Sequence, residues 1–596
     1  MKLQFRNQHI LYYLLCILFI MVFIAKIGTF HIEAIDLGFL KQILHPEYPI
    51  GPLPYDPQFH YNYIVAFFAR LFGYEASAPE LAGIFWFLEQ AFTLLVLVKL
   101  CDFLFKDDRL TLILVIFIYL MLKSGETDQK TMLRPLHFLA IYYFLKENWL
   151  LAAIFSASIF YIHIGVALWW FIPSCFALCL VYLFKNRQVN IFQIMIYASI
   201  VTIMASPILY YYIASVGIEQ SFTKNEFFKN YWYGTVNNSV LYELIYSPKA
   251  LILILINVGV FTVGYMKWKN NGGRNNYILP IGLGVLILYV LDFVLVDVMF
   301  NGTAMKMQFL RSKLNIEFFV SLFFPFLIVR QIRRGNYVFF SLLLILLILY
   351  PFWSVLNSFI YRSDALIVLY AFVVTYEIFE GKFSRSREKI KSFFSRRLVV
   401  LRLPKITYKT HDFFQNPVNF VSFFVVIIAL QATLLLSPIK PYVKSVLGIQ
   451  QKTGMSKSES LFQDITRFTN EKIPGEKVYI VFPFGKGDFK YYTNQKVFIS
   501  EMTMLEYSPS HIRQFENIFK NDLNYTIEEL KNGGSWNEIW RSVDEKLIRK
   551  WIKEYSITHV IRENELPLDF PIAYENEHYT IYDLRLLNNF QEGIKT

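Results

Sequence analysis

Apolar segments long enough to cross a membrane repeat along most of this chain, and they restrict its fold more than any other feature. An α-helix needs about 20 predominantly apolar residues to cross the hydrocarbon core of a bilayer. About thirteen such segments, several of them short, lie at roughly residues 9–29, 80–104, 109–123, 133–146, 149–164, 166–184, 190–214, 249–267, 277–298, 315–331, 337–356, 363–379 and 418–437. This pattern predicts a polytopic α-helical membrane protein with about thirteen transmembrane helices.

The composition supports a membrane protein over a soluble one. Hydrophobic residues make up 55% of the chain, which includes 59 phenylalanines and 39 tyrosines, more than most soluble proteins can carry without aggregating. The net charge of +12 would suggest nucleic-acid binding in a soluble protein. Here the basic residues lie mostly in short gaps between apolar segments, which is how membrane proteins encode orientation. We therefore expect contact with membrane lipid and no nucleic-acid partner.

The charges between the segments predict the orientation of the chain. The first segment follows Lys2 and Arg6 and precedes no small-residue cleavage site, which indicates a retained signal anchor with a cytoplasmic N-terminus. Each gap that follows an even-numbered segment is then cytoplasmic, and all six are basic: 106–109, 146–148, 185–187, 267–274, 330–334 and 382–409. The last belongs to a basic loop, 380–415, that we expect to lie on anionic headgroups. An odd number of segments places the C-terminus outside the cytoplasm.

Two domains follow from this division. Residues 1–437 form the predicted multi-pass domain, with an outside first loop at 30–79, and residues 438–596 form a predicted extracytoplasmic α/β domain. In the latter we expect strands near Val478–Phe482, Lys496–Ile499, Thr558–Ile561 and Tyr579–Tyr582, and helices near Ser508–Phe519 and Val543–Tyr555. None of the four cysteines falls in this second domain, so we expect no disulfide framework there.

The first outside loop carries the acidic residues that best suit chemistry. Glu33 and Asp36 follow the first segment and would share one helical face at spacing i, i+3. A carboxylate held beside an apolar surface has a raised proton affinity and can act as a general base. The alternative is an ordinary solvated loop acid. A third acid, Asp56, ends a proline-rich run at 46–57 that we expect to form an extended strap over the membrane.

Histidines accompany these acids in the first loop. His31, His45 and His60 together with the carboxylates are compatible with a divalent cation, but their spacing matches no strong metal signature. No cofactor is therefore predicted with certainty.

Four further residues with cationic or potentially cationic side chains are predicted at the outer ends of the segments. They are Arg134, His163, Arg311 and Arg362. Such side chains suit a lipid phosphate, which arginine grips in bidentate fashion, or they extend to ordinary headgroups. Charged residues inside the segments are costly, so we expect Glu89, Asp292 and Asp297 to face a cavity or a partner, for instance Lys99.

The order of these features resembles the GT-C fold of membrane glycosyltransferases. The resemblance rests on a cytoplasmic start, one helix, an acid just outside it, an amphipathic stretch at Leu37–Leu44 and a proline-rich strap. Three stretches also resemble uncharacterised bacterial proteins of this architecture, at Met132–Pro135, Tyr161–His163 and Tyr491–Ser500. By position, the resemblance implies that Asp36 is the catalytic base, with Glu33 or Asp56 as a helper or metal ligand.

The resemblance implies an inverting transferase in the bacterial plasma (inner) membrane. Its donor would be a polyprenyl-phosphate-linked sugar, and its acceptor an envelope glycan, a lipid or a protein on the outer face. Two alternatives remain at this point. One is a transporter or flippase, although no internal repeat is evident, and the other is a non-catalytic assembly factor for envelope polysaccharide.

Overall fold

The computed structural model describes ten of the thirteen predicted segments and much of the C-terminal region. The described residues are 59–73, 78–106, 108–122, 130–184, 190–216, 248–299, 309–334, 362–379, 457–473, 478–481, 496–497, 518–524, 541–555 and 557–585, with single positions between some of these ranges. The segments predicted at 9–29 and 418–437, and most of 337–356, lie outside the described residues, as does the loop 380–415.

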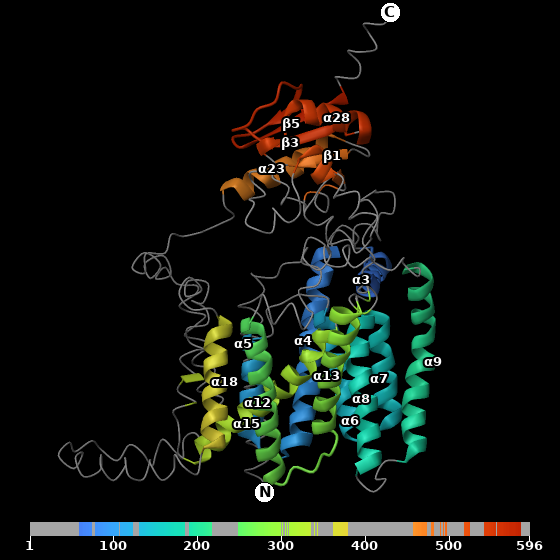
Figure 1. The fold of residues 1–596 in the computed structure, drawn as a ribbon, viewed down its shortest axis with the longest axis vertical. Helices are drawn as coiled ribbons and strands as arrows, with labels where there is room; N and C mark the ends of the chain where they lie inside the picture. The colour runs from blue at the N-terminus through green and yellow to red at the C-terminus, as the bar shows by residue number, and fades with distance from the viewer. Residues whose placement is uncertain are drawn as a thin grey trace, which may run out of the picture.

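The described residues before 380 form a bundle of helices (Figure 1). Its members are α3 (Phe59–Phe72), α4 (Ala78–Phe105), α5 (Arg109–Leu122), α6 (Lys130–Leu145), α7 (Trp149–Ile162), α8 (Ile164–Phe184), α9 (Ile191–Val216), α12 (Pro248–Asn270), α13 (Ile278–Asp292), α15 (Lys313–Arg333) and α18 (Arg362–Ile378). A π-helical turn, η2 (Phe293–Val298), continues α13, and a 3-10 turn, η3 (Phe309–Ser312), precedes α15.

The bundle has the helices that its apolar segments predict. Five stretches of it are both long and apolar enough to cross a membrane: Ile164–Phe184, Ile191–Tyr210, Ile252–Asn270, Ile278–Val298 and Phe309–Arg333. The last is mostly buried inside the bundle, whereas most of Ile191–Tyr210 faces outward. Helix α15 is therefore central in the bundle and α9 peripheral.

Helix α3 was not predicted, because the whole span 30–79 was expected to be a loop. The sequence after Pro57 contains no further proline until position 79, and apolar side chains recur there at helical spacing. Phe67, Leu71 and Phe72 remain more than half exposed on this helix. Such a short amphipathic helix with exposed aromatic groups is typical of a segment that lies in a membrane interface.

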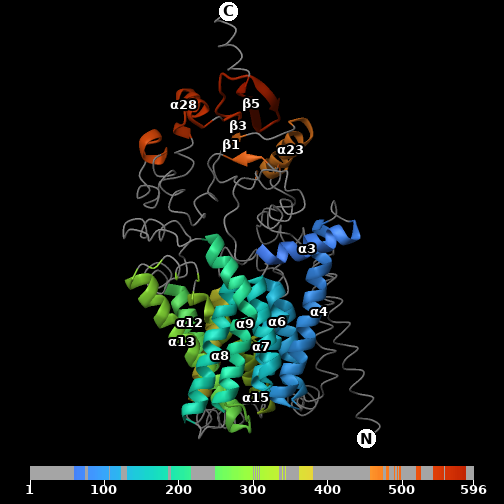
Figure 2. The same cartoon turned by 90° about the vertical axis from the view of Figure 1, so that its right-hand side faces the viewer.

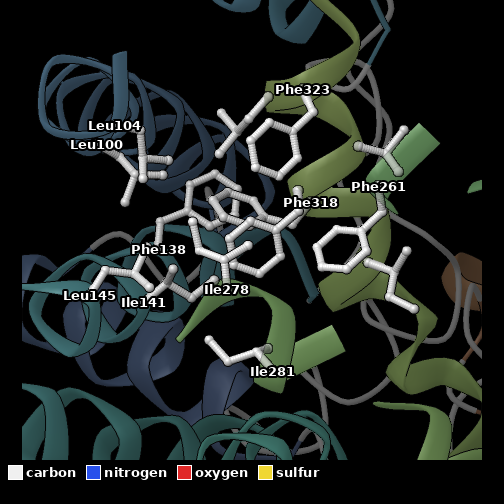
Figure 3. Close-up of a cluster of buried hydrophobic side chains, with 14 of the residues drawn as sticks. Leu100, Leu104, Phe138, Ile141, Leu145, Phe261, Ile278, Ile281, Phe318 and Phe323 are labelled. Atoms are coloured by element: carbon white, nitrogen blue, oxygen red, sulfur yellow. The ribbon is translucent and has the colours of Figure 1, made fainter. Parts of the chain in front are cut away.

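Aromatic side chains fill the centre of the bundle (Figure 3). Phe138 of α6 meets Phe318 of α15 with ring centroids 4.4 Å apart, and Phe261 of α12 lies 6.2 Å from Phe323. Helix α13 contributes Ile278 and other apolar groups to the same cluster. These contacts join helices that are about 180 residues apart in the sequence, as at Phe138 and Phe318, into one core.

The C-terminal described residues build a five-stranded sheet with order β2-β1-β3-β5-β4. The strands are β1 (Val478–Val481), β2 (Lys496–Val497), β3 (His559–Glu563), β4 (Ile572–Glu575) and β5 (Tyr579–Asp583). Strand β1 pairs in parallel with β2 and β3, whereas β5 pairs antiparallel with β3 and β4. Four of the strands were predicted, and β4, most of whose residues are exposed, was missed.

Helices cover both faces of this sheet (Figure 2). Helix α23 (Lys457–Lys472) packs against the face that carries Ile561 and Ile581, and α28 (Glu545–Tyr555) packs against the face that carries Val560. Neighbouring residues of β1, β3 and β5 therefore enter two different cores, as strand geometry requires. The predicted helix at Val543–Tyr555 is confirmed as α28, and α23 is an addition to the prediction.

Candidate functional site

The predicted site residues fall into two groups. Glu33, Asp36 and Asp56 lie outside the described residues. The four predicted phosphate-binding side chains belong to described elements, since Arg134 lies in α6, His163 between α7 and α8, Arg311 in η3, and Arg362 at the start of α18. The side chain of Arg362 is outside the described part of the structure.

Arg134, His163 and Arg311 lie at the same end of the bundle. Helix α3 packs against α4 and α7 and lies across the end where α4, α6 and α8 begin (Figure 2). We call this the α3 end. Arg134 is one turn into α6 from this end, His163 separates α7 from α8 there, and Arg311 lies in the turn that leads into α15. Helix α3 is itself part of the predicted first loop, 30–79, so this described part of the loop lies at the same end.

A buried polar cluster positions Arg134. Its side chain lies at the hydroxyl of Tyr119 in α5, where the charge of Glu89 in α4 also acts. The Tyr119 hydroxyl donates a hydrogen bond to Gln90 Oε1 at 3.2 Å, and Gln90 Nε2 donates one to Glu89 Oε1 at 3.3 Å. Glu89 is only 6% exposed, so its charge is costly unless neighbouring groups compensate it. The sequence suggested Lys99 as a compensating partner, whereas the structure brings Arg134 to this cluster.

His163 caps the start of α8. Its backbone is extended, and its Nδ1 accepts a hydrogen bond from the backbone N–H of Val166 at 3.3 Å. Nδ1 is thus an acceptor, so in the neutral ring the proton lies on Nε2. The ring is buried against Gly165 and lies 5.8 Å from the Trp169 ring. This geometry gives His163 a structural role at the helix junction as well as a place near the site.

A second polar seam links α6, α8 and α15 beside Arg311. Asn315 Nδ2 donates a hydrogen bond to the Trp169 carbonyl at 2.7 Å, and the Trp169 indole donates one to the Met307 carbonyl at 2.8 Å. His137 of α6 lies next to Asn315, with its ring 5.5 Å from that of Trp170. These contacts hold η3 against α8 and fix the position of the Arg311 backbone.

Two atoms of this seam are shielded from solvent and lie outside ideal hydrogen-bond geometry with the described residues, although the side chains of His137 and Asn315 interact with each other. They are His137 Nε2 and Asn315 Oδ1. Their mutual contact accounts for part of the hydrogen-bonding capacity of these two buried side chains. Sequence reasoning missed both residues. Their spacing could have revealed them. His137 is three residues after Arg134 and Asn315 is four after Arg311, and in a helix such spacing places both members of a pair on one face.

The acids predicted within the segments lie at the same end. Asp292 is buried at the last residue of α13, and Asp297 lies in the π-helical turn η2 that follows. Helix α13 packs against both η2 and η3, the turn that holds Arg311. Single π-helical turns are frequent at functional sites, and this one places Asp297 close to the end of the bundle.

The sheet contains a separate polar row that fits a structural role. The His559 ring stacks on Tyr479 with centroids 4.8 Å apart, and its Nε2 lies 3.9 Å from Asp583. Burial alone would raise the pKa of Asp583, but hydrogen bonds from Arg585 at 2.9 and 2.6 Å hold that pKa below its usual value. The carboxylate is therefore committed to an arginine, and the His559 side chain is fully buried.

No group of three or more potential metal ligands occurs among the residues that the structure describes. The histidines and acids of the first loop lie outside that part of the chain, so a divalent cation there stays a prediction.

Comparison with known proteins does not assign the chain to a family. No family model matches it, and no curated protein has a significantly similar sequence.

Proposed function

We propose that this chain is a multi-pass membrane glycosyltransferase. It would transfer a sugar from a polyprenyl-phosphate donor to a glycan, lipid or protein acceptor outside the cytoplasm of a bacterial cell. In this proposal about thirteen helices of residues 1–437 span the plasma membrane, and residues 438–596 lie outside. The observation that supports it most is the gathering of Arg134, His163 and Arg311 at the α3 end.

The chemistry needs three kinds of group at one membrane surface. The lipid carrier keeps the reacting phosphate at that surface, and cations there stabilise the negative charge of the leaving phosphate. In our proposal Arg134 and Arg311 bind that phosphate, with Arg362 as a third candidate, while His163 holds the junction of α7 and α8. His137 and Asn315 add shielded polar atoms deeper on the same helical faces.

The first loop would supply the base in this proposal. Asp36 would remove the proton from the acceptor hydroxyl, and that oxygen would displace the polyprenyl phosphate from the anomeric carbon with inversion. Glu33 or Asp56 would orient the acceptor or hold a divalent cation. The position of α3 supports this proposal, because α3 begins three residues after Asp56 and packs against α4 and α7 at the α3 end.

The test is transfer by the full-length protein in membranes supplied with radiolabelled polyprenyl-phosphate sugars and an extract of envelope acceptors. Asp36→Asn keeps the size of the side chain but removes the proton acceptor, so transfer should fall at least about a hundredfold. Arg134→Gln should lower transfer by about tenfold or more, since a charge-assisted hydrogen bond to the phosphate contributes about 1.5–3 kcal/mol.

Arg109→Gln is the matched control for the cation. Arg109 begins α5 at the opposite end of the bundle and pairs with Asp102 at 3.2 Å, so its loss should leave transfer within about twofold. Full activity in Asp36→Asn with a loss in Asp56→Asn would assign the base to Asp56. Movement of the labelled lipid across the membrane without release of polyprenyl phosphate would replace the proposal with a flippase.

A further inference from the structure

A cavity lies at the other end of the bundle, about one bundle length from the α3 end. It has a volume of about 450 Å³ and opens where α4, α6, α12 and α15 end. Its walls include the residues just after α4 and α6 and the loop from Asn271 to Asn275. None of the residues predicted for transfer lines it. The cavity is therefore independent of the proposed transferase site.

The cavity has an aromatic wall that is rigidly held. The Trp268 indole donates a hydrogen bond to the Leu104 carbonyl at 2.9 Å, and Gly273 packs so closely on that indole that a Cβ would lie 2.4 Å from it. Asn275 Nδ2 donates to the Leu145 carbonyl at 2.9 Å. Phe326 of α15 lines the cavity as well. The shape of this wall depends on hydrogen bonds between helices, so it is present without a ligand.

The acidic groups that line the cavity are already bound to other groups. Asp108 accepts hydrogen bonds from the backbone N–H and the hydroxyl of Thr111, at 3.1 and 2.8 Å, and pairs with Arg333 at 2.8 Å. Glu147 interacts with the hydroxyl of Tyr277. Asp108 is thus paired with Arg333, and Glu147 is the one carboxylate left beside the remaining cations of the cavity, because a bond to a neutral hydroxyl leaves its charge in place.

Lys106, Lys146 and Arg274 are those remaining cations. The ammonium of Lys146 bonds to the hydroxyl of Tyr142 at 3.1 Å, which leaves its charge uncompensated. Lys106 and Arg274 have neither a hydrogen bond nor an ion pair with any described side chain. These three cations outnumber the single carboxylate, Glu147, that has no ion pair, so the uncommitted charge of the cavity is positive. Helix C-termini carry partial negative charge, but the bonds from Trp268 and Asn275 occupy carbonyls at two of the four ends.

Two non-glycine residues that line the cavity have a strained backbone, which favours a functional role for their side chains. Lys106 and Glu147 adopt φ values of 49° and 62°, a left-handed conformation in which glycine is usual at a helix C-terminus. Gly272, with φ of 91°, also lines the cavity. Glycine would be the less costly residue at position 106, yet the chain has a lysine there. Residues held in such conformations cluster at functional sites.

We propose that this cavity binds a phosphate ester, with Lys106 and Arg274 at the phosphate and Trp268 and Phe326 against its apolar part. The ester is either the headgroup of an anionic phospholipid or a soluble phosphate ester. Both share the chemistry that the cavity recognises, namely a compact anion attached to an apolar or glycerol group. The loop charges predict that this end of the bundle faces the cytoplasm, where anionic headgroups are abundant.

The test is native mass spectrometry of the full-length protein in detergent, titrated with phosphatidylglycerol or with phosphatidylcholine. The protein should bind phosphatidylglycerol at least about tenfold more tightly. The double variant Lys106→Gln/Arg274→Gln should lose this preference, whereas Lys269→Gln should keep it. Lys269 is the matched control because it lies on α12 beside the cavity, bonds to Asn276 at 3.2 Å and does not line the cavity wall.

Competition with glycerol 3-phosphate then distinguishes the two sources. Displacement of the lipid at millimolar concentration identifies a site for soluble phosphate esters, and retention of the lipid identifies a headgroup site. Lys106→Gly separates loss of the ammonium group from loss of stability. Glycine suits the left-handed conformation, so this variant should raise or preserve the melting temperature and still weaken phosphatidylglycerol binding several-fold. Unchanged binding in Lys106→Gly and in the double variant, or an equal loss in Lys269→Gln, would overturn the proposal.

Discussion

At the scale of single residues, Glu377 is a buried charge that side chains from several helices compensate together. Its side chain is fully shielded in α18, where it accepts hydrogen bonds from Arg330 and Gln331 of α15. Lys267 of α12 lies 3.5 Å away. A carboxylate buried without such partners would cost several kcal/mol. Glu377 therefore joins three helices near the end opposite to the α3 end.

We predict that Glu377→Ala lowers the free energy of unfolding by about 3–5 kcal/mol, because the charge of Arg330, whose side chain is 12% exposed, loses its partner. Thermal unfolding of the detergent-solubilised protein measures this. Asp102→Ala is the control, since it breaks the more exposed pair with Arg109, whose side chains are 40% and 24% exposed, and should cost at most about 1 kcal/mol. Equal losses in both variants would show that Glu377 is not a structural junction.

Several helices of this bundle pack closely where one of them carries a glycine. A Cβ on Gly284 of α13 would lie 2.7 Å from the Cα of Pro173 in α8, and one on Gly264 of α12 would lie 2.5 Å from the Cβ of Phe323. Small residues at such contacts let helix backbones pack closely, which stabilises helix association in membranes. The apolar pattern of each helix predicts its existence, but this pairing of a glycine with a proline emerges only from the packed helices.

We predict that Gly284→Ala destabilises the bundle by about 1–3 kcal/mol, because the contacting atom is backbone and cannot move aside. Gly259→Ala is the matched control on α12, since its Cβ would meet only Val374 Cγ1 at 3.7 Å, an ordinary contact. Alanine is the better helix former, so this second variant should be neutral or slightly stabilising. Melting temperatures of the two variants in detergent compare them directly, and a Gly284→Ala protein as stable as the unaltered chain would contradict the close approach.

At the scale of the whole molecule, the distribution of loop charge decides orientation. The described helix ends agree with the predicted order, because Lys106, Lys146, Arg274 and Arg333 line one cavity at one end. They come from four gaps that the positive-inside rule places together in the cytoplasm. In the described part of the chain these four gaps therefore lie at the same end of the bundle, which is compatible with the predicted orientation.

We predict that a reporter active only in the cytoplasm is silent when fused after Thr596, and that the same reporter is bright when inserted after Asn271, in the loop between α12 and α13. The physical reason is that basic loops resist transfer across the membrane, so the odd number of segments leaves the C-terminus outside. Bacterial colonies that carry the two fusions give the comparison. A bright C-terminal fusion would show that one of the segments outside the described residues does not span.

The sequence alone predicted the membrane class and the approximate bounds of the helices from 80 to 379 that the structure describes, because a run of about 20 apolar residues has few alternatives to a buried helix. It also predicted four of the five strands from their short apolar runs. It missed α3, because the whole span 30–79 was expected to be a loop, and it missed β4, most of whose residues are exposed. Its acids Glu33, Asp36 and Asp56 stay predictions outside the described residues.

Tertiary structure decided which side chains meet. His137 and Asn315 are ordinary polar residues in the sequence, and they become neighbours only because α6 and α15 pack together. Lys106 and Arg274 likewise face one cavity only after the α12–α13 loop folds over the ends of α4 and α6. The physical reason is the distance along the chain over which each effect acts. Hydropathy and loop charge act locally along the chain, whereas a site depends on contacts between residues more than a hundred positions apart, which packing alone determines.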